Sequence, residues 1–408
     1  MRSDIDRLMA EEGVDVLLVV GPSEANADLA FITRGASVSG GPVVKKRGCV
    51  PILLYHPMEI EGARASGCEI VSVKDVGLDD ILRETPDRFH ALVLATSRIV
   101  ERLGIRGRVQ FAGRADPSVF HHLVAELVRG HTEIVPVRPA REGLLVRARL
   151  TKDEDEVARI REVGRRACRI LGATIEWLAG LRARGGELAD GAGPVTIGRV
   201  KARLRSALAE EGMTDHGHTI FAQGSDGAHA HSRGNDSQVV KTGVPIVFDF
   251  FPQELGGYWF DMTRTFCLGS APREFLAHFD LVRRAFDAAL ATIGAGAETR
   301  AAHEAACQVF EDAGHPTQRS DPKSNVGYHH SLGHGIGLDI HEDPVLGLAK
   351  SALCSFEPGM VFTVEPGLYY PEKGFGVRIE DVVRIDVSGR LENLTDYPVE
   401  PVVPLSRS

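Results

Sequence analysis

The sequence has no long apolar run and no closely spaced cysteines, and each absence excludes a class of protein. The opening residues, MRSDIDRLMAEEG, place acids where a secretory signal peptide has its apolar core, and no run approaches the roughly 18 apolar residues of a membrane span. Because no two cysteines have a C-x-x-C spacing, neither a disulfide framework nor a thiolate zinc site is indicated. We therefore expect a cytoplasmic chain with reduced, structural cysteines, namely Cys49, Cys68, Cys168, Cys267, Cys307 and Cys354.

Acidic residues outnumber basic ones, 56 to 47, and no basic run stands out. The formal net charge is −9, and the stretch VVKKRG at 43 to 48 holds only three cations in a row. Since a nucleic-acid surface needs a basic patch to neutralise phosphates, we expect no nucleic acid among the main partners. Hydrophobic residues make up 43% and charged residues 25%, which is typical of a folded globular protein, and 408 residues exceed what one core usually serves. The sequence therefore predicts two domains.

The first part of the chain, residues 1–150, alternates between strand and helix patterns. Short apolar runs predict strands, and segments with helical spacing between them predict helices, so this part is expected to be a smaller α/β domain. We find no catalytic constellation in it, and the adjacent His121 and His122 are interpreted as an exposed surface pair. The predicted strands are 14–21, 49–55, 90–96 and 108–113, and the predicted helices are 78–85 and 118–130.

A second domain, residues 151–408, is expected to begin with a long helix. Thr151 with Glu154 three positions later has the pattern of a capping box, and apolar residues follow at helical intervals. The glycines in 182–187 are expected to end this helix, and three more helices are predicted at 195–212, 272–293 and 299–315. Because strand-like segments lie between and after these helices, the whole chain is expected to be α+β.

Most of the chemistry lies in the strand-like segments. Asp249 lies in PIVFDFF, and Asp261 follows after a Gly256-Gly257 turn, so a hairpin could bring the two carboxylates together. Glu365 in MVFTVEPG and Glu380 in GVRIEDVV flank a second turn in the same way. Two acid-bearing hairpins predict a pseudo-twofold site.

Four buried carboxylates would repel one another and lose hydration, at a cost of several kcal/mol per ion, unless cations lie among them. Two divalent ions balance four carboxylates. Between the two acid pairs lies HHSLGHGIGLDIHEDP, in which glycines flank His334 and allow close approach to its imidazole. One imidazole with four carboxylates and no thiolate favours manganese, cobalt or zinc.

Four motifs resemble those of the pita-bread metallopeptidases, the family of Xaa-Pro aminopeptidases, Xaa-Pro dipeptidases and methionine aminopeptidases. They are GYWFDMTRTF, HSLGHGIGLDIHEDP, GMVFTVEPG and GVRIED, in the family's order and approximate spacing. The resemblance covers residue 151 to about residue 400, and the first part resembles the smaller N-terminal domain of the creatinase and prolidase branch. It implies a pita-bread catalytic domain preceded by a creatinase-like α/β domain.

The resemblance also implies roles for individual residues. The family's metal ligands fall on Asp249, Asp261, His334, Glu365 and Glu380. Its substrate-facing or supporting residues fall on His231, His330, His341 and Arg378, and His341, His330, His231 and Glu365 are the expected catalytic residues. The implied enzyme is a homodimer holding two divalent ions per chain, Mn²⁺ before Co²⁺ or Zn²⁺, in which a metal-bridging hydroxide attacks the carbonyl of a small peptide and Glu365 takes the proton.

The sequence departs from the family pattern in two places. The interval between Asp249 and Asp261 is one residue longer than the commonest pattern, so a turn or bulge must absorb a residue. Dipeptide-cleaving members commonly hold the free carboxylate of the substrate with an arginine between the ligand histidine and the first ligand glutamate. Residues 335–364 contain no arginine, and Lys350 is their only cation, which favours an Xaa-Pro aminopeptidase over an Xaa-Pro dipeptidase.

Two alternatives stay open on the same scaffold. One is an enzyme of another reaction class, either a creatinase-like amidinohydrolase or a metal-dependent lyase of small sulfonium acids. The complete ligand set argues against metal-free creatinase chemistry but is compatible with the lyase. The other is a non-catalytic pita-bread binding module, which the intact ligand set and the missing basic surface disfavour.

Overall fold

The computed structural model describes residues 1–139, 142–349 and 354–406, and the chain divides into two compact units, Met1–Arg149 and Leu150–Ser408. We call these the N-terminal and C-terminal units and describe each by itself. Among the described residues, no helix is both long and apolar enough to cross a membrane.

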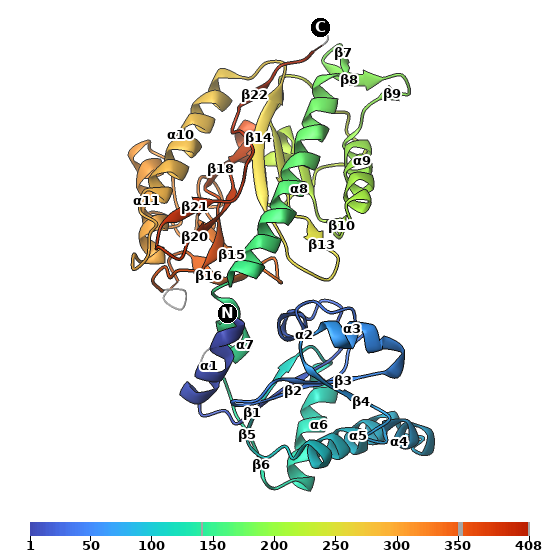
Figure 1. Ribbon diagram of the computed structural model, residues 1–408. Coiled ribbons are helices and arrows are strands. Elements are labelled where there is room, and N and C mark those ends of the chain that lie inside the picture. The colour runs from blue at the N-terminus through green and yellow to red at the C-terminus, as the bar shows by residue number, and fades with distance from the viewer. Residues whose placement is uncertain (140–141, 350–353, 407–408) are drawn as a thin grey trace. The chain divides into compact units, whose positions relative to one another are not determined.

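A six-stranded mixed sheet forms the centre of the N-terminal unit, in the order β4-β3-β2-β1-β5-β6 (Figure 1). β1 pairs parallel with β5 and antiparallel with β2, and one face of the sheet packs against α5 and α6 around buried Val16, Val109 and Ile99. The elements are α1 (Ile5–Glu11), β1 (Val16–Val20), α2 (Ala27–Thr33), β2 (Val43–Lys46), β3 (Ile52–Tyr55), α3 (Ile60–Ala65), β4 (Glu69–Ser72), α4 (Leu78–Glu84), α5 (Arg88–Leu103), β5 (Gly107–Gly113), α6 (Pro117–Gly130), β6 (Ile134–Pro136) and α7 (Leu144–Arg149), with short 3-10 helices at Arg2–Asp4 and Pro57–Glu59.

One predicted strand of this unit is wrong. Residues 90–96 lie inside helix α5, which begins after Asp87, whose side chain accepts a hydrogen bond from the backbone N–H of His90. The helix buries side chains at helical spacing, namely Ala91, Ala95 and Ile99. The apolar run HALVLAT therefore combines residues of the helix face that packs on the core with residues beside that face. A short apolar run cannot by itself distinguish a buried strand from a buried helix.

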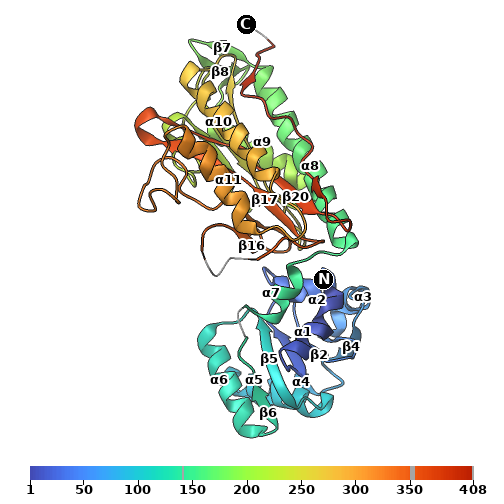
Figure 2. The ribbon, with the colours of Figure 1, turned by 90° about the vertical axis from the view of Figure 1, so that its left-hand side faces the viewer.

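The C-terminal unit has strands between two helix pairs (Figures 1 and 2). Helices α8 and α9 pack together on one side, and α10 and α11 pack together over β16, β17 and β19 on the other. The elements are α8 (Glu154–Ala179), β7 (Arg182–Arg184), β8 (Glu187–Asp190), β9 (Gly193–Pro194), α9 (Ile197–Glu210), β10 (Met213–Thr214), β11 (Ile220–Gln223), β12 (Ile246–Phe250), β13 (Gln253–Glu254), β14 (Met262–Leu268), α10 (Arg273–Leu290), α11 (Thr299–Asp312), β15 (Gly333–Gly335), β16 (Glu342–Leu346), β17 (Val361–Val364), β18 (Gly367–Tyr370), β19 (Phe375–Arg378), β20 (Asp381–Ile385), β21 (Leu391–Asn393) and β22 (Val402–Val403), with 3-10 helices at Gly224–Ala228 and Pro371–Lys373.

The start of α8 differs by two residues from the predicted capping box. Asp153 is the N-cap, and its side chain accepts from the N–H of Glu156 while the Glu156 side chain accepts from the N–H of Asp153. Thr151 instead forms an isolated antiparallel bridge with Met360. The helix ends at Ala179, and the glycine-containing segment 182–187, expected to end it, forms the β7–β8 hairpin. Thr151 with Glu154 and Asp153 with Glu156 both have the residue types and spacing of a capping box. Because Thr151 pairs with Met360, the helix begins after Asp153.

Two sheets carry the acidic motifs. One has the order β11-β12-β14-β22 and the other the order β16-β15-β17-β20-β21. β12 and β14 form the first predicted hairpin, with Asp249 opposite Thr263, and β18 and β19 form the second. An antiparallel bridge between Thr263 and Glu380 joins the two halves, so the hairpins meet at the motif residues.

Candidate metal centre

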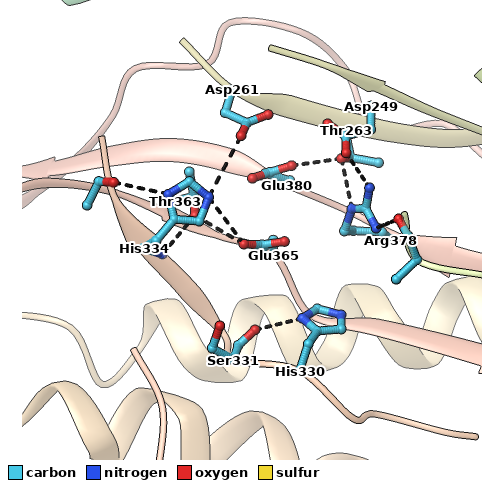
Figure 3. Close-up of polar contacts among 12 residues, drawn as sticks. Asp249, Asp261, Thr263, His330, Ser331, His334, Thr363, Glu365, Arg378 and Glu380 are labelled. Carbon is cyan, nitrogen blue, oxygen red and sulfur yellow. Dashed lines mark hydrogen bonds and ion pairs between the residues drawn. The ribbon is translucent and has the colours of Figure 1, made fainter. Parts of the chain in front are cut away.

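The site lies where these hairpins meet, and its ligand-type side chains converge from strands far apart in the sequence (Figure 3). Asp249 lies in β12, Asp261 directly precedes β14, Glu365 directly follows β17, and Glu380 lies between β19 and β20. The fifth residue, His334, lies in β15, which pairs with β17. The structure thus brings together all five residues for which the resemblance implies metal ligation.

Three of the five form the tightest group. One ligand atom each of Asp261, His334 and Glu380 lies within 4.8 Å of the others, and all three residues are buried. Nε2 of His334 lies 3.8 Å from Oδ2 of Asp261 and 3.5 Å from Oε1 of Glu365. In Figure 3 these side chains point toward one shared space, with Asp249 at its Arg378 side.

Arg378 organises that side of the site. Its Nη2 donates to Oδ2 of Asp249 at 2.5 Å, its Nη1 donates to the Tyr369 hydroxyl at 2.7 Å, and its Nε donates to Oγ1 of Thr263. The Thr263 hydroxyl in turn donates to Oε2 of Glu380 at 2.7 Å. The buried guanidinium therefore orients one carboxylate directly and a second through a threonine.

Three residues that support the site were not predicted from the sequence. Thr263 and Thr363 lie inside the quoted motifs GYWFDMTRTF and GMVFTVEPG, and the Thr363 hydroxyl accepts from the N–H of His334. A hydroxyl residue two positions from a ligand acid, on the same face of a strand, was the available signal. Tyr369 had no such signal, because only the β18–β19 pairing places its hydroxyl against Arg378.

Burial dominates the electrostatics of the acids. It raises the pKa of Asp261 well above its ordinary value, and the charges of Glu380, Asp249 and Glu365 raise it further. The pKa of Glu380 is raised in the same way, by burial and then by Glu365 and Asp249. Burial also raises the pKa of Glu365 to about 8, although Arg378 opposes this rise. One guanidinium does not compensate four carboxylates.

The residues present fit divalent metal ions. Oδ1 of Asp249 and Oδ1 of Asp261 are buried and have no hydrogen-bond partner among the described residues, which is costly for a carboxylate oxygen without a cation. Nδ1 of His334 lies 3.0 Å from the Gly335 carbonyl oxygen, which can only accept, so Nδ1 carries the hydrogen and Nε2 presents a bare lone pair toward the acids. Burial lowers the pKa of His334 to about 3, which keeps the ring neutral, as a ligand must be.

The three other histidines differ in how closely they approach this centre. The His341 ring is exposed and lies 4.3 Å from the His334 ring, centre to centre. The half-buried His330 packs against Tyr369, and its Nδ1 donates to the Ser331 carbonyl, so Nε2 is an acceptor, with no partner among the described residues. His231 is exposed, and its proximity contributes to lowering the pKa of His341, although burial lowers that pKa more.

The two departures from the family pattern have different outcomes. The extra residue between the aspartates is taken up beyond β12, where Gln253 in β13 bridges Trp259, and Asp249 keeps its place opposite Thr263. Lys350, the only cation between His334 and Glu365, lies outside the described residues.

Comparisons with known proteins agree with this fold. The "X-Pro aminopeptidase from Thermotoga maritima" superposes with a TM-score of 0.75 at 24% identity, over 97% of this chain and all of that chain (100%). The "Xaa-Pro dipeptidase from Bacillus anthracis" superposes with a TM-score of 0.76 at 23% identity, over 98% of this chain and 99% of that chain. At these identities the likeness shows the fold alone, a pita-bread domain preceded by a smaller domain.

Sequence relatives point in the same direction. The "Probable dipeptidase PepE" of Mycobacterium tuberculosis is 29% identical over 264 residues, which are 64% of this chain and 63% of that protein, so the match spans somewhat less than two thirds of that relative. The "Uncharacterized peptidase YqhT" of Bacillus subtilis is 25% identical over 97% of this chain and 98% of that protein. The sequence model of "Metallopeptidase family M24" matches residues 158–386, more than half of the chain and all five candidate ligands. The chain therefore belongs to metallopeptidase family M24.

Proposed function

We propose that this chain is a dinuclear metal-dependent peptidase that hydrolyses the bond on the N-terminal side of proline, as an Xaa-Pro aminopeptidase in preference to an Xaa-Pro dipeptidase. The observation that carries the proposal is the convergence of four carboxylates with the bare Nε2 of His334 in one buried space. We further assign residues 1–150 to a creatinase-like domain and 151–408 to the catalytic domain, in a homodimer.

We assign Asp249, Asp261, His334, Glu365 and Glu380 as ligands of two divalent ions, with Mn²⁺ preferred over Co²⁺ or Zn²⁺. Hard carboxylate oxygens in the majority, one imidazole and no thiolate support this choice. When bound, such ions lower the pKa of a coordinated water and polarise a scissile carbonyl. Arg378 has a positioning role, because it fixes Asp249 and, through Thr263, Glu380.

Glu365 is the proposed proton acceptor. Its Oε1 lies 3.5 Å from Nε2 of His334 and within reach of the Thr363 hydroxyl, at 3.5 Å, so the carboxylate is held among the candidate ligands. Without metal, burial raises the pKa of Glu365 to about 8. Bound cations would lower that pKa, so the carboxyl would be ionised before the reaction and could then accept a proton from the attacking water.

We propose that three histidines, His231, His330 and His341, contact the substrate. We place His341 beside the developing oxyanion because its ring adjoins His334 and is exposed, and we place His231 near the leaving group. His330 has a different chemistry: its free Nε2 accepts hydrogen bonds, so it suits an N–H of the peptide better than an oxyanion.

A panel of peptides tests the reaction class and the specificity. Xaa-Pro dipeptides, matching Xaa-Pro tripeptides and proline-free controls would be assayed with Mn²⁺, Co²⁺ and Zn²⁺ in turn. We expect the tripeptides to have a kcat/KM at least equal to that of the dipeptides, because residues 335–364 supply no guanidinium to bind a free carboxylate. A strong preference for dipeptides would refute the aminopeptidase assignment, and equal cleavage of proline-free peptides would refute the Xaa-Pro assignment.

Metal stoichiometry tests the dinuclear assignment separately. Because four carboxylates call for about four compensating charges, dialysed protein reconstituted with Mn²⁺ should hold two ions per chain by elemental analysis. The variant Asp249→Asn keeps a similar volume and should hold fewer. A saturating value of one ion in the folded wild-type protein would contradict a dinuclear centre.

A further inference from the structure

Lys152 and Glu342 form a buried ion pair close to the metal centre. Nζ of Lys152 lies 2.8 Å from Oε2 of Glu342, and the two side chains are only 2% and 4% exposed. Removing two charges from water costs several kcal/mol per ion, so such a pair is weak evidence for stability and points to a need for fixed geometry. Neither residue is among the assigned ligands or substrate-facing groups.

The loop before Glu342 is folded around its carboxylate. Oε1 accepts hydrogen bonds from the backbone N–H groups of Leu338 and Asp339, at 3.0 and 3.1 Å. Gly337 leaves room for the same carboxylate, since a Cβ there would lie 2.6 Å from Oε2. The residue directly before Glu342 is His341, whose ring lies 4.3 Å from that of His334. The carboxylate therefore fixes the loop that carries His341.

The lysine is itself fixed to another part of the site. Its backbone N–H donates to the Gly359 carbonyl at 2.7 Å, and its neighbour Thr151 bridges Met360. Met360 directly precedes β17, the strand that leads to Glu365. The backbone of Lys152 thus contacts the residues that lead to the strand before Glu365, and its side chain contacts the loop that carries His341.

We propose that Lys152 and Glu342 are positioning residues that hold His341 in a fixed position relative to Glu365. This inference rests on the proposed function, in which Glu365 accepts a proton and His341 faces the oxyanion. The pair binds no metal and touches no substrate. Its loss should displace His341 by a fraction of an ångström to an ångström and lower turnover while leaving the ligand set intact, since misplacements of this size cost up to about 100-fold in rate.

The kinetic test is a double-mutant cycle between Lys152→Met and His341→Ala. Lys152→Met should lower kcat by about 10- to 100-fold with two ions still bound, and should cause little further loss in the His341→Ala background. Lys201→Met is the matched control, because the Lys201 side chain is also largely buried, at 9% exposed. Its Nζ lies 2.7 Å from Oδ1 of Asp236, a residue outside the loop that carries His341. Equal losses from Lys152→Met in both backgrounds would overturn the proposal, since the lysine would then act independently of His341.

A second measurement does not depend on activity. Hydrogen exchange of peptides covering 335–342 should be faster in Lys152→Met than in wild type or Lys201→Met, because the Leu338 and Asp339 amides lose a fixed acceptor. If Lys152→Met does not fold, Lys152→Met/Glu342→Leu removes both buried charges together with the acceptor of the two amides and should show the same faster exchange and lower kcat. Unchanged exchange in this loop would refute the positioning role. If the wild type cleaves no Xaa-Pro peptide but hydrogen exchange of 335–342 is still faster in Lys152→Met, the proposed function is refuted. The role of Lys152 in fixing this loop is then retained.

Discussion

At the scale of single residues, the centre depends on groups that support one another rather than on isolated ligands. Thr263 links Arg378 to Glu380, and Thr363 links the backbone of His334 to Glu365. Glu380 and Glu365 are thus oriented by neighbouring hydroxyl groups, which lowers the cost of assembling the site. Glu365 is the residue to which we give two roles, as ligand and as proton acceptor.

The substitution Glu365→Gln separates these two roles. Glutamine keeps a carbonyl oxygen and nearly the same volume but removes the basic oxygen, so turnover should fall by about 10²- to 10⁴-fold. Because losing a negative charge also weakens metal binding, occupancy must be measured together with the rate. Near wild-type peptidase activity at full occupancy would show that another group accepts the proton.

The comparison for this variant is His341→Ala. His341 touches no ion in the proposed scheme, so this change should lower turnover through lost oxyanion stabilisation while two ions stay bound. Loss of metal from His341→Ala would place this histidine among the ligands and would require a new assignment of the centre.

At the scale of elements, the packing of helix α8 against the first hairpin positions Asp261. Phe260, the residue before Asp261, is fully buried, and a Cβ on Gly164 of α8 would lie 2.3 Å from its ring. Successive side chains of an extended segment point to opposite faces, so the phenylalanine facing α8 turns the aspartate toward the centre. The helix fits only because residue 164 has no side chain.

Gly164→Ala tests this packing. In an open helical position, replacing glycine by alanine stabilises by up to about 1 kcal/mol, but overpacking a core costs about 1–3 kcal/mol. We expect the net effect to be a lower free energy of unfolding, measured by urea titration, and a lower metal affinity. Gly130→Ala, at the end of α6 with nothing within 4 Å of the new Cβ, should show no loss. Equal stability of the two variants would refute tight packing at Gly164.

The elements also show which parts of the fold could be predicted from the sequence. In the part of the C-terminal unit that the structure describes, the α-helices α8 to α11 and both acid-bearing hairpins follow from apolar periodicity and from glycine turns, which are local signals. Residues 90–96 were wrongly predicted as a strand because seven mostly apolar residues are too few to show either the helical or the strand period. The N-cap of α8 is Asp153 and not the predicted Thr151, because Thr151 pairs with Met360, a contact between residues far apart in the sequence.

At the scale of the whole molecule, four of the candidate ligands could be identified before the fold because each lies in one of the quoted family motifs, and Asp249 followed from its strand before the Gly256-Gly257 turn. Tyr369 and the Lys152–Glu342 pair could not, since only the assembled sheets bring these side chains to their partners. Charge balance predicted that cations lie among the four converging acids, but it left out Arg378, which already neutralises part of that charge. Sequence therefore predicts ligand type better than it predicts the surrounding network.

The uncompensated acids also make a prediction about the stability of the whole protein without metal. Burial raises the pKa of Glu365 from 4.5 to about 8 and also raises those of Asp261 and Glu380, so the folded protein holds protons that the unfolded chain has released. Where the native state binds more protons, stability falls as pH rises. His330 and His334 have pKa values lowered from 6.5 to about 3, so above pH 6.5 they are largely neutral in both the folded and the unfolded state and add little to the pH dependence of stability.

We therefore expect chelator-treated protein to lose stability between pH 6.5 and 8, by about 1.4 kcal/mol per pH unit for each proton retained. Urea titrations at several pH values would measure this slope. Saturating Mn²⁺ should abolish it, because bound cations keep the acids ionised in the folded state. Metal-free Glu365→Gln, which lacks one titrating group, should show a shallower slope than the metal-free wild type. A stability that rises with pH in this window would mean that the four carboxylates are already compensated within the protein, and the electrostatic basis for two metal ions would be lost.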